Sequence, residues 1–405
     1  MISLDEARRR VLDGVVSLTP TEIACEYTAG LVLAQDVVAA ENVPPFANTA
    51  VDGYAVRSAD VSAACELRVI GTVAAGDGTE WSVGAGEALR IMTGAVMPVG
   101  ADAVVMVEDT EPLAGDRVRI GKAIAAGVAV RPVADDVRAG AVVFARGTVL
   151  SPAGAGVLSS INARQVSVYP RVKVALLSTG DELVTDGSPL RRGQIRESNL
   201  TMLEILLTND ECEVSNLGVI ADDEATLERV LLDAARNNDA IVTSGGVSMG
   251  DFDVVKAVLS RIAEMQWMQM AVKPAKPFAF GILTVDGRRV PVFGLPGNPV
   301  SSMISFELLA RAALRKMMGH TRDLVRPLVR AIADSPLRRK PDGKVHFMRV
   351  FAQFGDDGRV HVRDTGPQGS HQLAATAAAN ALAVVPDGTG VVAGADVDVM
   401  LLGNH

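Results

Sequence analysis

The sequence has few cysteines and few aromatic residues. Its three cysteines, Cys25, Cys65 and Cys212, lie far apart and form no C-x-x-C pair. This spacing does not predict a disulfide framework or a cysteine zinc site, and the five histidines show no metal-ligand spacing. Aromatic residues make up 4% of the chain, too few to predict a surface that stacks single-stranded nucleic acid.

Positive charge and long apolar runs are also scarce. The net charge is −9, which disfavours binding of a nucleic-acid duplex but leaves room for a local small-anion site. The longest apolar runs are too short to predict a membrane span. The first residues carry Asp5 and Glu6 in place of the apolar stretch of a signal peptide, and Ser3 and Glu6 have capping-box spacing. We therefore expect a helix there and a cytoplasmic protein.

The length and the residue patterns predict an α/β multidomain protein. A chain of 405 residues is too long for one hydrophobic core. Residues 1–40 have a mostly helical pattern, whereas the stretches around 55–138 and 322–405 contain short β-branched runs separated by glycine. We expect a discontinuous helical linker domain (1–50 and 139–168), an inserted β-rich domain (51–138), an α/β domain (169–320) and a C-terminal β-barrel domain (321–405).

Continuous apolar runs alternate with helix-period segments between residues 170 and 318. The runs lie at 172–177, 240–242 and 290–293. Unbroken apolar strands that alternate with helices are typical of a parallel sheet covered on both faces. Ligands of such sheets bind beyond the carboxyl ends of the strands, so the loops that follow these runs are the candidate site.

The first of these loops is STGDE, residues 178–182. Gly180 lets the backbone approach a ligand after Thr179, and Asp181 and Glu182 place two carboxylates at a strand end. The alternative is a charged helix start, because acidic residues favour the first helical turn.

The second loop, TSGGVSMGDFD, spans residues 243–253 and precedes a helical pattern. Its glycines and serines, which include Ser244, Gly245, Gly246 and Ser248, suit an anion cradle of backbone amides and hydroxyls. The loop has neither the P-loop spacing nor the dinucleotide-binding spacing. Because Asp253 and its neighbour Asp251 would repel phosphate, we expect a bridging Mg²⁺. A tight turn with incidental polarity is the alternative.

A third loop and a pair of lysines extend the candidate site. The loop after 290–293 contains Pro296, Gly297 and Asn298 and could equally be a rigid connector. Lys273 and Lys276 alternate with prolines in KPAKP, which denies this segment a helix. They are candidate phosphate ligands, with solvated surface lysines as the alternative.

Several strings taken together resemble the molybdopterin molybdenumtransferase (MoeA) family, which also includes the E domain of gephyrin. They occur in the family's order, and GSHQ near residue 369 extends the likeness into the last domain. The strings are PPFANTAVDGYAV, IMTGAVMPVGADAVVMVED, LLSTGDELV, GQIRESN, TSGGVSMGDFD, KPAKPFAFG and FGLPGNPVSS.

The resemblance implies a four-domain subunit with a MoaB/MogA-like α/β domain. It implies a homodimer with the active cleft between domains of both chains, and a reaction that inserts molybdate into adenylylated molybdopterin with release of AMP, assisted by Mg²⁺. Expected partners are the molybdopterin adenylyltransferase and molybdoenzyme acceptors, with no nucleic acid and no membrane.

The resemblance also implies roles for individual residues. The implied metal ligands are Glu182 and Asp253, and Arg349 and Ser370 are candidate donors to molybdate. The implied catalytic set is Asp52, Glu182, Asp222, Asp253, Lys273 and Lys276. The expected substrate-binding set joins four residues implied by the resemblance, Thr93, Asp136, Arg349 and Ser370, to the residues of the three strand-end loops, Thr179, Gly180, Ser244, Gly245, Gly246, Ser248, Pro296, Gly297 and Asn298.

The sequence departs from the family pattern at two places. Arg196 and Glu197 stand where a tyrosine–aspartate pair is common, and Val51 stands where methionine is common. Four other functions remain open: the adenylyltransferase of the same pathway, a nucleotide-recycling hydrolase with the same α/β module, a gephyrin-like scaffold, and a tungstate-specific insertase. The adenylyltransferase and the hydrolase lack the inserted β domain, and no fused adenylyltransferase domain or long linker favours the scaffold.

Overall fold

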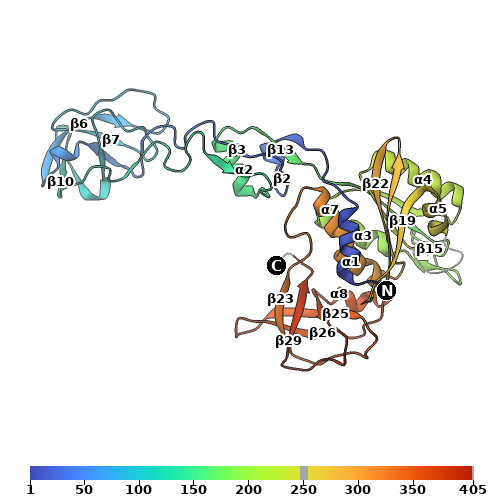
Figure 1. Ribbon diagram of the computed structural model, residues 1–405. Coiled ribbons are helices and arrows are strands. Elements are labelled where there is room, and N and C mark those ends of the chain that lie inside the picture. Colours follow the sequence, from blue (N-terminus) through green and yellow to red (C-terminus); the bar gives the residue numbers. More distant parts are fainter. Residues whose placement is uncertain (247–253, 404–405) are drawn as a thin grey trace. The chain divides into compact units, whose positions relative to one another are not determined.

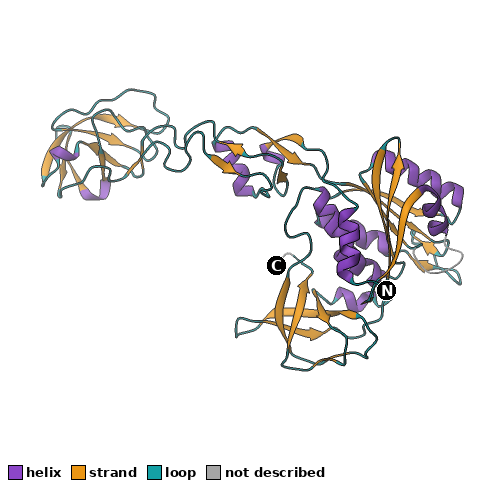
Figure 2. Cartoon of the chain, viewed as in Figure 1, coloured by secondary structure: helices purple, strands orange, loops and turns teal. Residues whose placement is uncertain are grey.

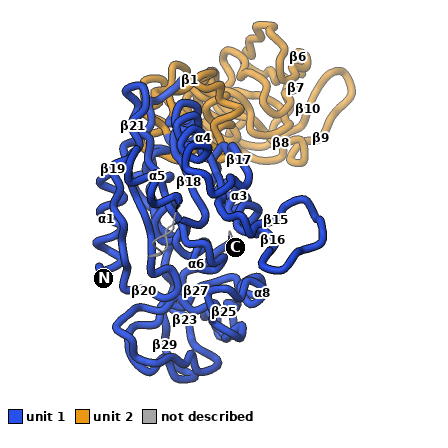
Figure 3. The backbone as a smooth tube through the Cα atoms, turned by 90° about the vertical axis from the view of Figure 1, so that its right-hand side faces the viewer, with its two compact units in different colours: residues 1–21, 30–32, 169–405 blue, residues 22–29, 33–168 orange. Residues whose placement is uncertain are grey.

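The computed structural model describes residues 1–246 and 254–403, which fall into two compact units (Figure 3). The first unit contains residues 1–21, 30–32 and the chain from residue 169 onward, and holds the α/β and C-terminal domains. The second contains residues 22–29 and 33–168.

The α/β domain is built on a six-stranded sheet. The described strands follow the order β17 (Glu213–Ile220), β14 (Lys173–Thr179), β18 (Ala240–Ser244), β22 (Arg288–Leu295), β21 (Pro277–Val285) and β19 (Ala263–Gln269). The first four are parallel, which confirms the predicted α/β domain, but β21 and β19 run antiparallel to their neighbours. Asp286 and Gly287, both with positive φ, connect β21 to β22 by the tight turn that suits an antiparallel hairpin.

Alternating side chains of the strands build two hydrophobic layers. Val174 and Leu176 of β14 face a layer that holds α1 (Leu4–Asp13), α3 (Asn199–Asn209), α6 (Pro299–Ser305) and α7 (Arg311–Met317). Ala175 and Leu177 face the opposite layer with α4 (Glu224–Asn237) and α5 (Val254–Ile262). Figures 1 and 2 show these helices beside the sheet. This two-sided burial explains why the strands are continuously apolar in sequence.

The C-terminal domain is a closed barrel. The barrel strands are β25 (Val345–Phe354), β26 (Val360–Asp364), β23 (Leu328–Ala333), β29 (Asp396–Leu401) and β27 (Ala381–Val385), and β27 pairs with β25 to close the ring. This confirms the predicted β-barrel. Smaller elements accompany these domains: the two-residue strands β20 (Val272–Lys273), β15 (Leu183–Val184), β16 (Ile195–Arg196), β24 (Leu337–Arg338) and β28 (Gly390–Val391), the short helix α8 (Leu373–Ala377), and a π-helical turn, η4 (Phe306–Ala310).

The second unit contains the predicted β-rich domain. Its sheet has the order β8 (Ala103–Met106), β5 (Gly53–Val56), β7 (Glu87–Ile91), β6 (Cys65–Val73), β10 (Arg117–Ile120) and β9 (Thr110–Leu113). Two short 3₁₀ turns, η2 (Ser58–Asp60) and η3 (Val107–Asp109), and a two-stranded pair, β4 (Asn48–Thr49) with β11 (Val130–Arg131), complete it.

The expectation that residues 1–40 are mostly helical is wrong beyond α1. After Pro20 the chain forms β1 (Thr21–Ala24), the 3₁₀ turn η1 (Cys25–Tyr27), β2 (Val32–Leu33) and β3 (Val37–Val38). These strands pair with β13 (Gln165–Tyr169) and β12 (Val142–Phe144), which flank α2 (Pro152–Ser160). Buried residues such as Val32 and Leu33 therefore pack through strand pairing. Residues 139–168 do rejoin the N-terminal segment, but they do so through strands.

No helix in the described part of the chain is long and apolar enough to cross a membrane.

Candidate active site

Three neighbouring parallel strands end at the same edge of the α/β sheet. Ser178 of β14 is in register with Ser244 of β18, and Ser244 is in register with Leu295 of β22. The loops that follow these residues are the three loops predicted from the sequence. The parallel register brings them together, as expected for the ligand-binding edge of such a sheet.

The loops approach one another backbone to backbone at glycines. The N–H of Gly245 donates to the Leu295 carbonyl oxygen at 3.0 Å. Gly245 has a φ of +94°, and a Cβ atom there would lie 3.1 Å from the Thr179 carbonyl oxygen. A Cβ on Gly297 would lie 3.7 Å from the Cα of Gly245. A side chain at Gly245 would therefore separate the first loop from the second.

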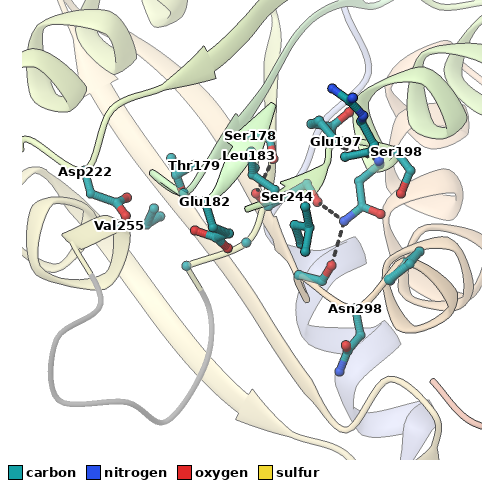
Figure 4. Close-up of a pocket in the computed structure, with 18 of the residues that line it drawn as sticks. Ser178, Thr179, Glu182, Leu183, Glu197, Ser198, Asp222, Ser244, Val255 and Asn298 are labelled. Carbon is teal, nitrogen blue, oxygen red and sulfur yellow. Dashed lines mark hydrogen bonds between the residues drawn. The ribbon is translucent and has the colours of Figure 1, made fainter. Parts of the chain in front are cut away.

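A cleft of about 770 Å³ opens at this edge (Figure 4). This volume is in the range of small-molecule sites. The predicted residues that line it are Thr179, Gly180, Glu182, Asp222, Ser244, Gly245, Gly246, Gly297 and Asn298. The structure thus brings together residues from four segments that lie far apart in the sequence.

Acidic and hydroxyl groups share this cleft. In the view of Figure 4, Ser244 lies between Glu182 and Glu197, and Asp222 lies beyond Glu182 on the side of Thr179. Asp181 is not among the lining residues, and its carboxylate accepts a hydrogen bond from the Asp222 N–H at 3.3 Å. The side chain of Asp181 therefore supports the loop that carries Asp222.

Part of the predicted anion loop lies outside the described residues. Ser248, Asp251 and Asp253 fall in residues 247–253, so the prediction that Asp253 is a metal ligand stays a prediction. Within residues 1–246 and 254–403, no three histidine, cysteine or carboxylate side chains are grouped closely enough to hold a metal ion.

Two residues at the start of α3 were not predicted as site residues. The Glu197 carboxylate accepts hydrogen bonds from the backbone N–H groups of Asn199 and Leu200, at 2.8 and 2.9 Å. Burial raises the pKa of Glu197, and these hydrogen bonds act in the opposite direction. Glu197 thus caps α3 in place of Ser198, whose side chain makes no capping bond. The string GQIRESN contains both residues, but it drew attention only to the Arg196–Glu197 pair.

Asn199 links three segments at the floor of the cleft. Its side-chain nitrogen donates to the Ser244 hydroxyl oxygen and to the Gly297 carbonyl oxygen, both at 2.8 Å (dashed lines in Figure 4). These bonds join the start of α3 to the ends of β18 and β22. A polar residue at a helix start gave no signal in sequence that it faced two other loops.

Comparisons with known proteins agree with this architecture. Three family models match: "MoeA N-terminal region (domain I and II)" over residues 2–162, "Probable molybdopterin binding domain" over 175–316 and "MoeA C-terminal region (domain IV)" over 330–402. The molybdopterin molybdenumtransferase of Haemophilus influenzae is 36% identical, covering 100% of this chain and 99% of that protein. The chain belongs to the molybdopterin molybdenumtransferase family.

Other members of the family show the same full-length likeness. Molybdopterin molybdenumtransferase 2 of Mycobacterium tuberculosis is 36% identical over 98% of this chain and 99% of that protein. A crystal structure of the molybdopterin biosynthesis MoeA protein from Pyrococcus horikoshii superposes with a TM-score of 0.82 at 29% identity, covering 100% of both chains.

The two predicted lysines of this molybdenumtransferase homologue, Lys273 and Lys276, do not line the cleft. Lys273 belongs to β20 and pairs in register with His346 of the barrel. The Met270 N–H donates to the Lys276 carbonyl oxygen at 2.8 Å, and the Ala275 N–H contacts the Ser301 hydroxyl at 3.4 Å. Both lysine side chains are exposed, and their role as phosphate ligands stays a prediction.

Arg349 is fully buried and holds a loop. Its guanidinium donates to the carbonyl oxygens of Pro367 at 2.7 Å and Gly369 at 3.2 Å. Ser370 follows this loop, and its carbonyl oxygen accepts from the Val300 N–H at 3.2 Å. Arg349, Ser370 and the buried Pro296 do not line the cleft, whereas His371 does. Arg349 therefore positions the wall that carries His371, and a direct contact with molybdate stays a prediction.

The second unit brings two predicted residues together and places a third in a loop. Thr93 donates from its backbone N–H and its hydroxyl to one carboxylate oxygen of Asp52. These two hydrogen bonds, the backbone one first, hold the pKa of Asp52 below its ordinary value. Asp136 is exposed in a loop whose backbone N–H donates to the Val43 carbonyl at 2.9 Å. The roles of all three residues stay predictions.

Proposed function

We propose that the protein is a molybdopterin molybdenumtransferase that inserts molybdate into adenylylated molybdopterin and releases AMP. The observation that carries this proposal is the cleft itself. The Ser244 hydroxyl and the backbone of Gly246 and Asn298 meet the carboxylates of Glu182 and Asp222 there. Full-length relatives that are named molybdopterin molybdenumtransferase support the transfer of molybdenum to molybdopterin.

The donor groups suit the phosphates of the substrate. Backbone N–H groups and hydroxyls at the ends of parallel strands bind phosphate oxygens well, because they are hydrogen-bond donors held in place by the fold. Ser244 lies at the end of β18, and the two residues after it, Gly245 and Gly246, both have positive φ. These groups would hold the phosphoanhydride that joins the pterin phosphate to AMP.

The carboxylates suit the bond-breaking step. Water adds to the AMP phosphorus, the bond to the pterin phosphate oxygen breaks, and AMP and the pterin monophosphate separate. Glu182 and Asp222 can orient that water and accept its proton. Molybdate exchanges two of its oxygens for the dithiolene sulfurs, and those oxygens leave as two water molecules that take up the two thiol protons and two protons from solvent.

The donor set also suits Mg²⁺. This ion commonly takes one or two carboxylates and completes its shell with substrate phosphates and water. Two carboxylates, Glu182 and Asp222, line the cleft beside the phosphate donors. In our proposal Glu182 and Asp253 hold the ion, which when bound offsets charge on the phosphoanhydride.

The test supplies purified protein with adenylylated molybdopterin, Mg²⁺ and molybdate, and measures AMP release and active cofactor. We expect release that depends on molybdate, and release without that dependence would contradict the proposal. A parallel reaction with tungstate in place of molybdate tests for a tungstate-specific insertase, which would release AMP with tungstate only. The adenylyltransferase alternative predicts formation of adenylylated molybdopterin from ATP, which we do not expect.

Two variants examine the carboxylates. Glu182→Gln should retain substrate binding and lose turnover by about 10²-fold or more, the usual range for general acid–base groups. Glu224→Gln on the exposed face of α4 makes the same chemical change outside the cleft and should leave turnover unchanged. Equal turnover rates in both variants would show that the Glu182 carboxylate has no catalytic role and serves only the local backbone turn.

Light scattering after size exclusion tests the proposed homodimer, and a fully active monomer would contradict it.

A further inference from the structure

Asn199 is almost fully buried at the first position of α3, yet it lines the cleft. It is 6% exposed. Its own backbone N–H donates to the Glu197 carboxylate at 2.8 Å, which fixes the start of the helix. A side chain held this firmly beside a ligand cleft can set the geometry of groups that touch the ligand.

The orientation of the Asn199 carboxamide follows from its partners. The Gly297 carbonyl can only accept a hydrogen bond, so the group that faces it at 2.8 Å must be the side-chain nitrogen. The same nitrogen lies 2.8 Å from the Ser244 hydroxyl oxygen. Ser244 therefore accepts from Asn199 and keeps its own hydroxyl proton to donate elsewhere.

The remaining oxygen of Asn199 shows that this arrangement has a cost. Among the described residues the buried Oδ1 atom has no hydrogen-bond partner. A buried carbonyl oxygen without a partner is unfavourable, because it has lost its hydrogen bonds to water. The orientation that leaves it unpaired is retained because both amide hydrogens are used at Ser244 and Gly297.

The same bonds orient the peptide between Gly297 and Asn298. This peptide is trans, so its N–H points away from the carbonyl that Asn199 holds. Ser244 is also fixed from its other side, since the Ser178 hydroxyl donates to the Ser244 carbonyl at 3.1 Å. Ser244 and Asn298 both line the cleft.

We propose that Asn199 is a positioning residue that presents two donors, the Ser244 hydroxyl and the Asn298 backbone N–H, to a phosphate oxygen of the bound ligand. This inference deepens the proposed function and rests on it for the nature of the ligand. A residue that only stabilised the fold would affect ligand binding with or without the Ser244 hydroxyl. Under this proposal the effect of Asn199 on ligand binding requires that hydroxyl.

A double-mutant cycle on AMP binding tests this coupling by calorimetry. Asn199→Asp keeps the shape but places an oxygen against the Gly297 carbonyl and draws the Ser244 proton toward itself. We expect Asn199→Asp and Ser244→Ala each to weaken AMP binding by roughly tenfold or more. The AMP affinity of the double variant should lie within about threefold of the affinity of whichever single variant binds AMP more weakly.

Matched variants separate folding from binding. Asn237→Asp makes the same change on α4, where the side chain donates to the Asp233 carbonyl at 2.9 Å, and should leave AMP affinity unchanged. If Asn199→Asp fails to fold by circular dichroism, Asn199→Ala removes both donors without adding charge and enters the same cycle.

The outcomes separate this inference from the proposed function. Fully additive effects of the two substitutions, or unchanged AMP affinity in Asn199→Asp, would overturn the inference even if the wild-type protein forms cofactor. A wild-type protein that does not bind AMP would also overturn it. A non-additive cycle in a protein without molybdate-dependent AMP release would support the inference and contradict the proposed function.

Discussion

The hydroxyl and the backbone N–H of Thr93 both donate to one carboxylate oxygen of Asp52, at 2.8 and 2.7 Å. The pair lies on the exposed surface of the inserted β domain. Both bonds favour the ionised carboxylate and hold its pKa below the ordinary value. Asp52 is thereby kept charged and pointed in one direction without being buried.

Replacing Thr93 by valine should raise the pKa of Asp52 only part of the way toward about 3.9, the ordinary value, because valine removes the hydroxyl hydrogen bond but keeps the backbone N–H, which is the larger cause of the lowered pKa. A lowered carboxyl pKa stabilises the folded state above the unfolded pKa, and this contribution is lost as the pH falls through the folded pKa. The stability difference between wild type and Thr93→Val should therefore be present above about pH 4 and shrink in more acidic solution. Carboxyl-carbon NMR titration measures the pKa. Thr93→Ser is the control and should preserve it, and an unchanged pKa in the valine variant would contradict the hydrogen-bond assignment.

Gly245 should tolerate no side chain. Its φ of +94° is unfavourable for L-residues, and an added Cβ would press on the Thr179 carbonyl at 3.1 Å. We expect Gly245→Ala to lower the free energy of unfolding by about 1–2 kcal/mol and to weaken AMP binding. In a Trp81→Phe background the remaining Trp267, on β19, reports unfolding of the α/β domain in urea.

Gly287 is the matched control for this prediction. It also has a positive φ, but no atom lies within 4 Å of its added Cβ, and it sits in the turn at the opposite ends of β21 and β22. Gly287→Ala should show the backbone strain alone and leave AMP affinity unchanged. Equal losses of AMP affinity in the two variants would mean that the approach of Gly245 to Thr179 is unimportant for the cleft.

Much of the cleft could be predicted because its residues follow buried strands directly. Thr179, Ser244 and Gly297 each lie at or just beyond a strand end, and parallel register then brings them to one edge. Asn199 could not be found this way, because it begins a helix and its two partners lie 45 and 98 residues further along the chain. Contacts over such separations depend on tertiary packing, which a local pattern does not encode.

In the N-terminal segment, the sequence pattern predicted a structure that is not present. Helical periodicity was expected through residue 40, but Val32 and Leu33 pair in a strand with a segment more than a hundred residues away. Two-residue strands carry too little alternation to be recognised. For Arg349 the family resemblance implied a ligand contact, which stays a prediction, but no local pattern predicted that this side chain is fully buried and donates to loop carbonyls.

Arg349 should be needed to hold the wall that carries His371. Arg349→Met preserves much of the side-chain volume but leaves the carbonyls of Pro367 and Gly369 without their donor. We expect a loss of about 2–3 kcal/mol in stability, the cost of a buried polar group left unpaired. Amide hydrogen exchange should show lost protection in residues 366–372. Arg363→Met on the neighbouring strand β26 is the exposed control, and equal protection in both variants would contradict the positioning role.

Glu307 belongs to a group of largely buried ion pairs in the α/β domain. It is 1% exposed in the π-helical turn η4, and its carboxylate accepts from Arg326 at 2.6 and 3.0 Å. Arg311, which also lies 3.9 Å from Glu307, pairs with Asp210 at 2.8 Å. The buried Arg311 and the partly buried Arg326 are thus balanced by two buried anions, Asp210 and Glu307.

Removing one charge from this group should cost much more than removing one from an exposed pair. Glu307→Gln leaves the Arg326 guanidinium without its counter-ion, and we expect a loss of about 3 kcal/mol. Glu224→Gln breaks the exposed pair with Arg261 and should cost less than about 1 kcal/mol. Urea unfolding followed by Trp267 fluorescence in the Trp81→Phe background compares the two variants directly. Similar small losses would show that Glu307 is already protonated when folded, in line with the direction in which burial raises its pKa. A loss confined to Glu307→Gln would show that the carboxylate stays ionised because Arg326 offsets that burial.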